Sequence, residues 1–290
     1  MIKTLVKKLN KYKTPILFVL PALIFFLIFK VYPILNLFWL SIHDVGRNVG
    51  DFVGLKNYGT LINDNVFYLA LLNTSIIVIC VVFFGTVFGY LCALLLTDKF
   101  KGQKLFRTLF FIPVVTTVSI IAVVWKMMYY PAPSGMLNFI LSYINIPAQQ
   151  WLADPDLALY ALLVPLIWRI IGYNMIIFIA ALKGLDKSQL EAAEVEGANW
   201  WQKLFYIIIP STKYAVNMVI ILAVLRTYKV FVPAYVMTSG DPQHRTETIA
   251  TWIYKQSFRY WDMGYGAAIA VVLFAMIMIL TLLQKKFQTD

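Results

Sequence analysis

Six long apolar segments dominate this 290-residue chain. A helix needs about twenty predominantly apolar residues to cross the hydrocarbon core of a bilayer. The segments that satisfy this requirement are 15–40, 69–97, 105–130, 157–182, 213–237 and 264–283. They predict an all-α integral membrane protein in which residues 1–290 form a single transmembrane domain with six membrane-spanning helices. The third segment is the least regular, because Pro113 and a pair of threonines lie inside it.

The composition supports a membrane protein and argues against a nucleic-acid binder. Only 13% of the residues are charged, whereas soluble domains contain about 25%. The net charge of +11 comes mainly from basic residues in short loops between the apolar segments. These residues form no basic stripe interleaved with stacking aromatic residues, which nucleic-acid recognition requires. We therefore expect membrane lipid, and no nucleic acid, around this chain.

The basic residues also predict the orientation of the chain. Fifteen Lys and Arg residues lie at the two ends of the chain and in the loops after the second and fourth spans, against five in the other three loops. Loops rich in Lys and Arg stay in the cytoplasm. We expect both termini, and the loop 183–212, to be cytoplasmic. No small-residue cleavage site follows the basic N-terminal segment, so we interpret the first apolar segment as an uncleaved span.

The cysteines and histidines predict neither a disulfide nor a metal site. Cys80 and Cys92 lie in one apolar segment, and on a helix they would be about 18 Å apart, which is too far for a disulfide. His43 and His244 lie in separate predicted loops without nearby Cys or carboxylate clusters.

One charged stretch interrupts the apolar pattern, the sequence EAAEVEGANWWQKLFYIIIP at residues 191–210. Ser188 and Glu191 have the spacing of a capping box, which predicts a short helix over LEAAEVE. Gly197 is the natural residue for a left-handed helix end. Asn199 and Gln202 then predict a second helix that runs to Pro210. The expected structure is helix, sharp turn, helix.

This stretch has two possible roles. It resembles in part an amphipathic helix at the membrane surface, with two tryptophans as interfacial anchors. However, residues 191–196 contain three acids and no Lys or Arg, and anionic lipid would repel them. A protein-docking element is the favoured interpretation.

The same residues resemble a family motif. Glu191, Ala192 and Ala193, followed by Gly197 and then by Ile207 and Pro210, resemble the EAA motif of binding-protein-dependent ABC importer permeases. The resemblance covers nearly the whole chain and is nearest to carbohydrate-uptake permeases of the maltose and glycerol-3-phosphate type. Further matching stretches are FVGLKNYGTLIND, FRTLFFIPVV, WLADPDLALYALL and VMTSGDPQHRTETIATWIYKQSF. The usual Asp before the glycine is Glu196 here, and the usual Leu before the proline is Ile209.

The resemblance implies a fold and a set of partners. It implies a type I ABC importer permease in a bacterial plasma (inner) membrane, with a coupling helix between helices 4 and 5 that docks on a separate ATPase. Glu191, Ala192, Ala193, Gly197 and Pro210 are the implied coupling residues. The implied partners are a second, paralogous permease chain, two ATP-binding cassette subunits, and an extracellular solute-binding protein that engages residues 238–262.

The resemblance also implies that this chain is a transporter subunit and not an enzyme. The sequence contains no G-x-x-x-x-G-K-[ST] phosphate loop, which phosphate binding of that type requires. ATP and Mg²⁺ are therefore expected on the partner ATPase subunits, with no cofactor bound by this chain. Closure of those subunits would switch the permease between outward and inward access.

Charged residues within membrane spans are candidates for functional sites. With Arg107 and Lys213 at the span ends counted as loop residues, they are Lys30, Lys126, Arg169, Arg226 and Lys229. Lys126 lies near a span end, from which it can reach the interface. For Arg169 a structural role and a ligand role are both open. Helical spacing predicts that Arg226 and Lys229 share a face, with Tyr228 close by.

No Asp or Glu in the six spans balances these cations. One hypothesis is an anionic ligand, such as a uronate-containing oligosaccharide or a phosphorylated polyol, for which Tyr173, Asn174 and Tyr228 would add stacking and hydrogen bonds. The alternative is that the cations pair with carboxylates of the second permease subunit. Separately, Gly85 and Gly89 form a G-x-x-x-G pattern that predicts close helix packing.

Other function classes fit less well. An ion-coupled secondary transporter usually needs acidic residues in the membrane, and often has an inverted repeat. A membrane enzyme would need a catalytic set at membrane depth, whereas both histidines lie in loops. An ABC permease for a solute other than a sugar is also an alternative.

Overall fold

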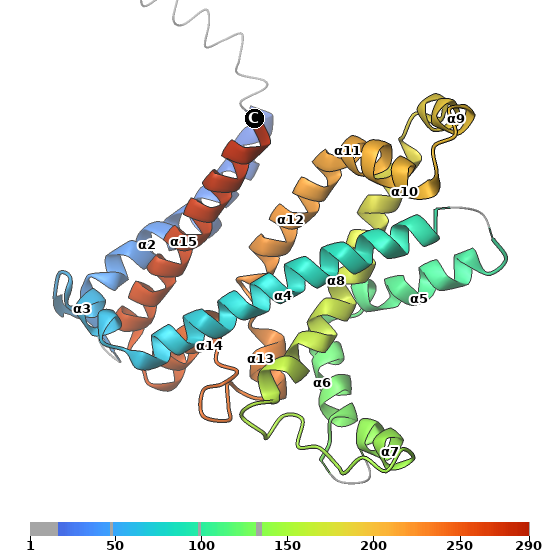
Figure 1. Cartoon of the computed structure of the whole chain (residues 1–290). Coiled ribbons are helices and arrows are strands. Elements are labelled where there is room, and N and C mark those ends of the chain that lie inside the picture. The colour runs from blue at the N-terminus through green and yellow to red at the C-terminus, as the bar shows by residue number, and fades with distance from the viewer. Residues whose placement is uncertain (1–16, 47–48, 98–99, 132–134, 290) are drawn as a thin grey trace, which may run out of the picture. The chain divides into compact units, whose positions relative to one another are not determined.

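The computed structural model describes residues 17–46, 49–97, 100–131 and 135–289. The basic N-terminal residues, the predicted start of the first span at Pro15 and the loop residue Lys99 lie outside this range. The chain divides into two compact units, Met1–Asn63 with Ile253–Val272 and Asp64–Trp252 with Leu273–Asp290. Each unit is described by itself (Figure 1).

The first unit begins with an apolar helix over Leu17–Ser41, of which the most apolar part has no buried residue. Its last part comprises the π-helical turn η1 (Leu27–Val31) and α2 (Tyr32–Ser41). The antiparallel strands β1 (His43–Val45) and β2 (Val49–Phe52) pair His43 with Phe52. The remaining elements are α3 (Lys56–Ile62), η3 (Lys255–Arg259) and the first part of α15 (Met263–Thr289).

Asn57 joins the elements of the first unit. Its side-chain amide donates to the carbonyl oxygens of Ser41 and His43, each at 3.0 Å. The first turn of α15 also packs closely here, because a Cβ atom at Gly264 would lie 2.3 Å from the His43 carbonyl oxygen.

In the second unit, the regular elements of the described residues are all helices. Its elements up to the charged stretch are α4 (Asn65–Leu95), α5 (Gln103–Val115), α6 (Val118–Met128), α7 (Met136–Ser142) and α8 (Ala158–Lys183). The elements that follow are α9 (Lys187–Val195), α10 (Trp200–Lys203), η2 (Leu204–Ile208), α11 (Ile209–Ser211), α12 (Lys213–Thr227), α13 (Val232–Met237) and the start of α14 (Ile249–Tyr254).

The predicted close packing at the G-x-x-x-G pattern is confirmed. Gly85 and Gly89 of α4 lie against α8, where added Cβ atoms would be 2.3 Å from Ile170 Cγ2 and 2.8 Å from Asn174 Cβ. Two buried clusters hold α4 and α8 to the helices around them, one centred on Ile77 and Leu162 and the other on Tyr90 and Phe178.

Four described helices are long and apolar enough to cross a membrane, or up to six if each of two bent helix pairs counts as one span. The four are Leu17–Ser41, Asn65–Leu95, Ala158–Lys183 and Met263–Leu283. The bent pairs are Gln103–Val115 with Val118–Met128, at 103°, and Trp200–Ser211 with Lys213–Thr227, at 65°.

The bends correct two details of the sequence prediction. The third segment, predicted as one span over 105–130 with Pro113 and a threonine pair as its irregular part, accommodates Pro113 inside α5 and breaks at Thr116 and Thr117, which are both extended. The fifth segment does not continue as one helix to Met237, because α12 ends at Thr227 and α13 begins at Val232.

We predict that Gly172→Ala destabilises the second unit. A Cβ atom at Gly172 of α8 would lie 2.0 Å from the Phe110 carbonyl oxygen of α5, so the two helix backbones would have to separate. Overpacking of this kind costs about 1–3 kcal/mol. The apparent melting temperature of the purified protein should fall. The control is Gly59→Ala in α3, where a Cβ atom meets nothing within 4 Å, and equal melting of the two variants would contradict the prediction.

Candidate functional site

The charged stretch folds as two short helices around a tight turn, which we call the α9–α10 element (residues 186–203). Gly197 has a φ of +80°, as predicted for a left-handed helix end. Its N–H donates to the Glu194 carbonyl at 3.0 Å, and the Ala198 N–H donates to the Ala193 carbonyl at 2.9 Å. These two bonds form a Schellman motif, which satisfies the last carbonyls of α9.

The N-terminal cap of α9 differs from the prediction, whereas that of α10 is confirmed. Asp186 caps α9 by accepting the Ser188 N–H at 2.9 Å, so the predicted capping box from Ser188 to Glu191 is wrong. An aspartate two residues earlier provides the acceptor, and Ser188 lies inside the helix. Asn199 and Gln202 form the expected reciprocal capping box, with bonds of 2.9 and 2.7 Å.

An ion pair joins the two helices across the turn. Lys203 Nζ lies 2.5 Å from Glu194 Oε1. Glu194 is exposed, whereas only 17% of the Lys203 side chain is accessible, so the pair fixes α10 against α9 more firmly than a fully solvated pair would.

The outer surface of α9 combines acidic and apolar side chains. Glu191, Ala192 and Glu196 are exposed, whereas Ala193 faces inward and is 9% exposed. Val195 is 90% exposed. Sequence reasoning missed Val195, because helical spacing alone does not indicate which side of so short a helix is covered. An exposed aliphatic side chain among carboxylates suits a protein partner better than anionic lipid.

The chain that leaves the α9–α10 element packs directly against α4, α8 and α12. Leu204, the first residue of η2, is 5% exposed and belongs to the buried cluster around Tyr90 and Phe178. The Tyr90 hydroxyl of α4 lies 2.8 Å from the Thr212 hydroxyl, at the bend between α11 and α12. A displacement of α10 would therefore be transmitted to α4, α8 and α12.

The second helix runs from Trp200 to Ser211, which confirms the predicted end at Pro210 to within one residue. Pro210 lies in the first turn of α11, directly after the π-helical turn η2. Proline lacks an N–H group and is tolerated in a first turn. The chain bends two residues later, at Thr212, whose hydroxyl donates to the carbonyls of Ile208 and Ile209.

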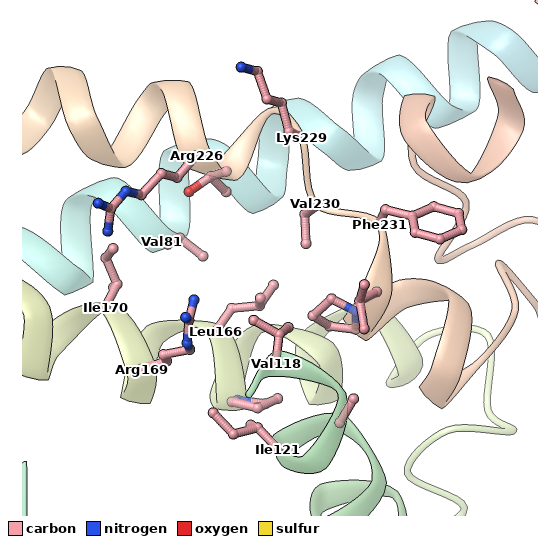
Figure 2. A pocket seen from close by; sticks show the side chains of 15 residues that line it. Val81, Val118, Ile121, Leu166, Arg169, Ile170, Arg226, Lys229, Val230 and Phe231 are labelled. Atoms are coloured by element: carbon pink, nitrogen blue, oxygen red, sulfur yellow. The ribbon is translucent and has the colours of Figure 1, made fainter. Parts of the chain in front are cut away.

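A second candidate site is a cavity of ≈ 220 Å³ in the second unit (Figure 2). α4, α6, α8 and the chain from Arg226 to Pro233 supply its wall. Most of the lining is aliphatic, but it includes three cations, Arg169, Arg226 and Lys229. Among the described residues that line it, none is Asp or Glu.

Arg226 contacts another predicted site residue. Its guanidinium carbon lies 3.8 Å from the centre of the Tyr173 ring, and its Nη2 donates to the Tyr173 hydroxyl at 2.8 Å. Arg169 is one helical turn before Tyr173 on α8, and its charge interacts with that of Arg226. The structure therefore brings together Arg169, Tyr173 and Arg226.

The other predicted substrate residues are placed differently. Lys229 lies beyond the end of α12, so it does not share a helical face with Arg226 as predicted. Tyr228 is buried and does not line the cavity. Asn174 is 1% exposed and packs against Gly85 and Gly89, between α8 and α4.

The two remaining cations of the spans are not among the residues that line this cavity. Lys126 donates to the Val236 carbonyl at 3.0 Å, and Lys30 is exposed within η1. Cys80 and Cys92 are free thiols. In the described parts of the chain, no three His, Cys, Asp or Glu side chains are grouped to hold a metal ion.

A buried carboxylate organises the loop after α13, which sequence reasoning missed. Glu247 is 0% exposed and accepts from Thr251 Oγ1 at 2.6 Å, with His244 Nδ1 at 3.0 Å. Asn73 of α4 donates to the carbonyls of His244 and Glu247. These contacts hold the loop between α13 and α14 against the N-terminal part of α4.

Comparisons with known proteins identify the family of this chain. Residues 85–289 match the family described as binding-protein-dependent transport system inner membrane component. The chain is 33% identical to the probable ABC transporter permease protein YurN of Bacillus subtilis, over 94% of this chain and 95% of that protein. It is 35% identical to the alpha-glucoside transport system permease protein AglF of Rhizobium meliloti, over 91% and 79%. It is 33% identical to the lactose transport system permease protein LacF of Rhizobium radiobacter, over 92% and 91%.

Solved structures show the same fold. A chain of a bacterial ABC transporter involved in the import of the acidic polysaccharide alginate superposes with a TM-score of 0.88, at 21% identity and over 98% of both chains. The family match covers both the α9–α10 element and the cavity cations. The chain belongs to the family of binding-protein-dependent transport system inner membrane components.

Proposed function

We propose that this chain is the permease subunit of an ATP-driven importer of sugars or oligosaccharides, and that it forms the translocation path by alternating access. Family membership supports the transporter class. Support for carbohydrate comes from the relatives, which are named for the transport of alpha-glucosides, lactose, arabinooligosaccharides, and trehalose or maltose. A solute other than a sugar is the alternative within this class.

The observation that carries the proposal is the α9–α10 element. It presents Glu191, Ala192 and Val195 on an exposed surface, while Leu204 lies in the core between the membrane helices. An exposed docking surface joined stiffly to the membrane helices is what a subunit needs if it receives mechanical work from a partner. In this proposal Gly197 shapes the turn and Ala193 supports the surface from within, while Pro210 lies in α11, where the α9–α10 element continues toward α12.

The remaining parts of the proposal follow from this role. Each bent helix pair would cross the bilayer as one span, giving six spans in one transmembrane domain of the bacterial plasma (inner) membrane. Loop 183–212 and both termini would be cytoplasmic. Two ATP-binding cassette subunits would bind ATP and Mg²⁺, a second and different permease chain would complete the path, and a solute-binding protein would dock outside, at residues 238–262.

An ion-coupled secondary transporter is the runner-up function. Coupling to protons or sodium usually needs an acidic residue within the membrane. The described helices α4, α5, α6, α8 and α12 contain no Asp or Glu, so the observed residues favour ATP as the energy source.

Reconstitution tests the proposal. The chain is purified with its ATPase subunits and second permease chain, incorporated into proteoliposomes and supplied with solute-binding protein. We expect uptake of at least one oligosaccharide from a panel containing maltotriose, arabinotriose, lactose and a uronate trisaccharide, and only when ATP is present on the ATPase side. Uptake driven by a proton or sodium gradient without ATP would contradict the proposal.

A further inference from the structure

The cavity in the second unit has the chemistry of an anion site. We propose that Arg169 and Arg226 bind the carboxylate, or another anionic group, of an acidic sugar on its way through the permease, and that Tyr173 positions Arg226 for this contact. The inference rests on the proposed function and adds a substrate class and a specificity site to it.

The first argument is an unsatisfied donor. Arg169 Nε is buried, and it has no hydrogen-bond partner within the described part of the chain. Burial without a partner removes water from a charged donor and costs free energy. Because Arg169 lines the cavity, an anion in the cavity can bind the rest of its guanidinium, and a small shift of the side chain toward that anion would bring Nε within reach of an acceptor.

The second argument is that Arg226 is held in place. The contact with the Tyr173 ring and the bond to the Tyr173 hydroxyl fix one face and one nitrogen of the guanidinium. Arginine has five N–H donors in a planar fork that matches a carboxylate. A side chain already ordered in this way loses little entropy when it binds an anion.

The third argument is the balance of charge. Figure 2 shows Arg226 approaching from α12 and Arg169 rising from α8, between the two helices, while Lys229 points away from both. The two guanidiniums repel each other, and no Asp or Glu is among the described cavity-lining residues. Arg226 is exposed, whereas Arg169 is partly buried, and aliphatic neighbours such as Val81, Val118 and Ile121 weaken the solvent screening around Arg169. An anion between the guanidiniums would replace repulsion with attraction.

The test compares two probes that differ only in charge. One is a tritiated uronate trisaccharide, and the other is the same trisaccharide with its carboxylates reduced to alcohols. Binding is measured by equilibrium dialysis on the purified complex of both permease chains and both ATPase subunits. The solute-binding protein is omitted, so that its own selectivity does not enter. We expect the wild-type complex to bind the charged probe about tenfold or more tightly, with a preference that falls as salt rises.

Substitutions in the cavity test which residues cause the preference for the charged probe. The double variant Arg169→Gln with Arg226→Gln should weaken binding of the charged probe by about tenfold to a hundredfold and leave the neutral probe unchanged. Arg226→Lys keeps the positive charge but lacks the planar guanidinium, so a partial loss of affinity for the charged probe is expected. Tyr173→Ala should lower the preference for charge, and Tyr173→Phe, which retains the ring, should lower it less. Lys126→Gln removes a cation outside this cavity and should have no effect.

Two results would overturn the inference. One is equal binding of the two probes by the wild-type complex, which requires no variant and therefore does not depend on folding. The other is an assembled double variant that keeps the preference for charge. If Arg226→Gln instead separates the two permease chains while Arg226→Lys retains them, the arginine pairs with the second chain and the inference is likewise wrong. None of these outcomes bears on ATP-dependent uptake, so the proposed function is tested independently.

Discussion

Replacing Gly197 with Val is expected to abolish stable association with the ATPase subunits and, with it, ATP-driven uptake. Gly197 has a φ of +80°, and a left-handed backbone costs an L-residue about 1–2 kcal/mol, with more for a β-branched side chain. The Schellman bonds to Glu194 and Ala193 would be lost together with the turn. Because the turn sets the direction in which Val195 and Glu191 project, we expect at least a tenfold loss in co-purified ATPase.

The matched control is Gly184→Val. Gly184 lies in the same loop, at the end of α8, but its φ is −83°, so a side chain is tolerated there. The measurement is the amount of ATPase subunit that co-purifies per permease, together with ATP-dependent uptake. A Gly197→Val variant that retains both at the wild-type level would show that the turn has no role in coupling.

Replacing Leu204 with Ala is expected to uncouple ATP hydrolysis from uptake without releasing the ATPase. Leu204 is 5% exposed and packs with Tyr90 and Phe178, and a buried Leu→Ala change costs about 2–5 kcal/mol. The cavity that it leaves would loosen η2 from the core, while the exposed surface of α9 stays intact. We therefore expect normal co-purification, continued hydrolysis and a severalfold lower ratio of sugar transported to ATP hydrolysed.

Leu95→Ala provides the comparison for this prediction. Leu95 ends α4 and is 73% exposed, so its truncation removes the same atoms without opening a core cavity. An unchanged transport ratio in Leu204→Ala would mean that movement reaches the membrane helices by another route.

Apart from the close packing at Gly85 and Gly89, the structural details that the sequence predicted correctly are local ones. The glycine turn at Gly197 and the capping box at Asn199 each depend on residues a few positions apart, and both are present. The cap predicted at Ser188 was wrong because α9 begins two residues earlier, where Asp186 accepts the Ser188 N–H and leaves Ser188 inside the helix. Asp and Ser are both favoured N-cap residues, so two candidates two positions apart differ little in free energy.

The features that the sequence did not predict depend on distant contacts. α12 ends at Thr227, and the Val230 carbonyl that follows is bonded by Thr248 Oγ1, which is 18 residues away. This break moves Lys229 off the helical face that it was expected to share with Arg226. The contact between Arg226 and Tyr173 spans 53 residues. Helical periodicity predicts which residues are neighbours on one helix, and it does not predict contacts between residues of different helices.

The exposed surface of α9 also depends on tertiary packing. Glu191, Ala192 and Ala193 are good helix formers, and their sequence alone does not indicate which of them is buried. The fold shows that Ala193 faces inward while Ala192 faces outward. The exposure of Val195 results from the same packing. A sequence pattern indicates that a docking element exists, and the structure indicates which side chains it offers.

Photo-cross-linking from α9 tests the central claim most directly. Cys80 and Cys92 are first replaced by Ser, and a benzophenone maleimide is attached to the thiol introduced by Val195→Cys in the assembled transporter. The account predicts a cross-linked product of permease and ATPase subunit from this position, and none from Thr60→Cys, an exposed position in α3. A product from the Thr60→Cys position, with none from Val195→Cys, would contradict the account.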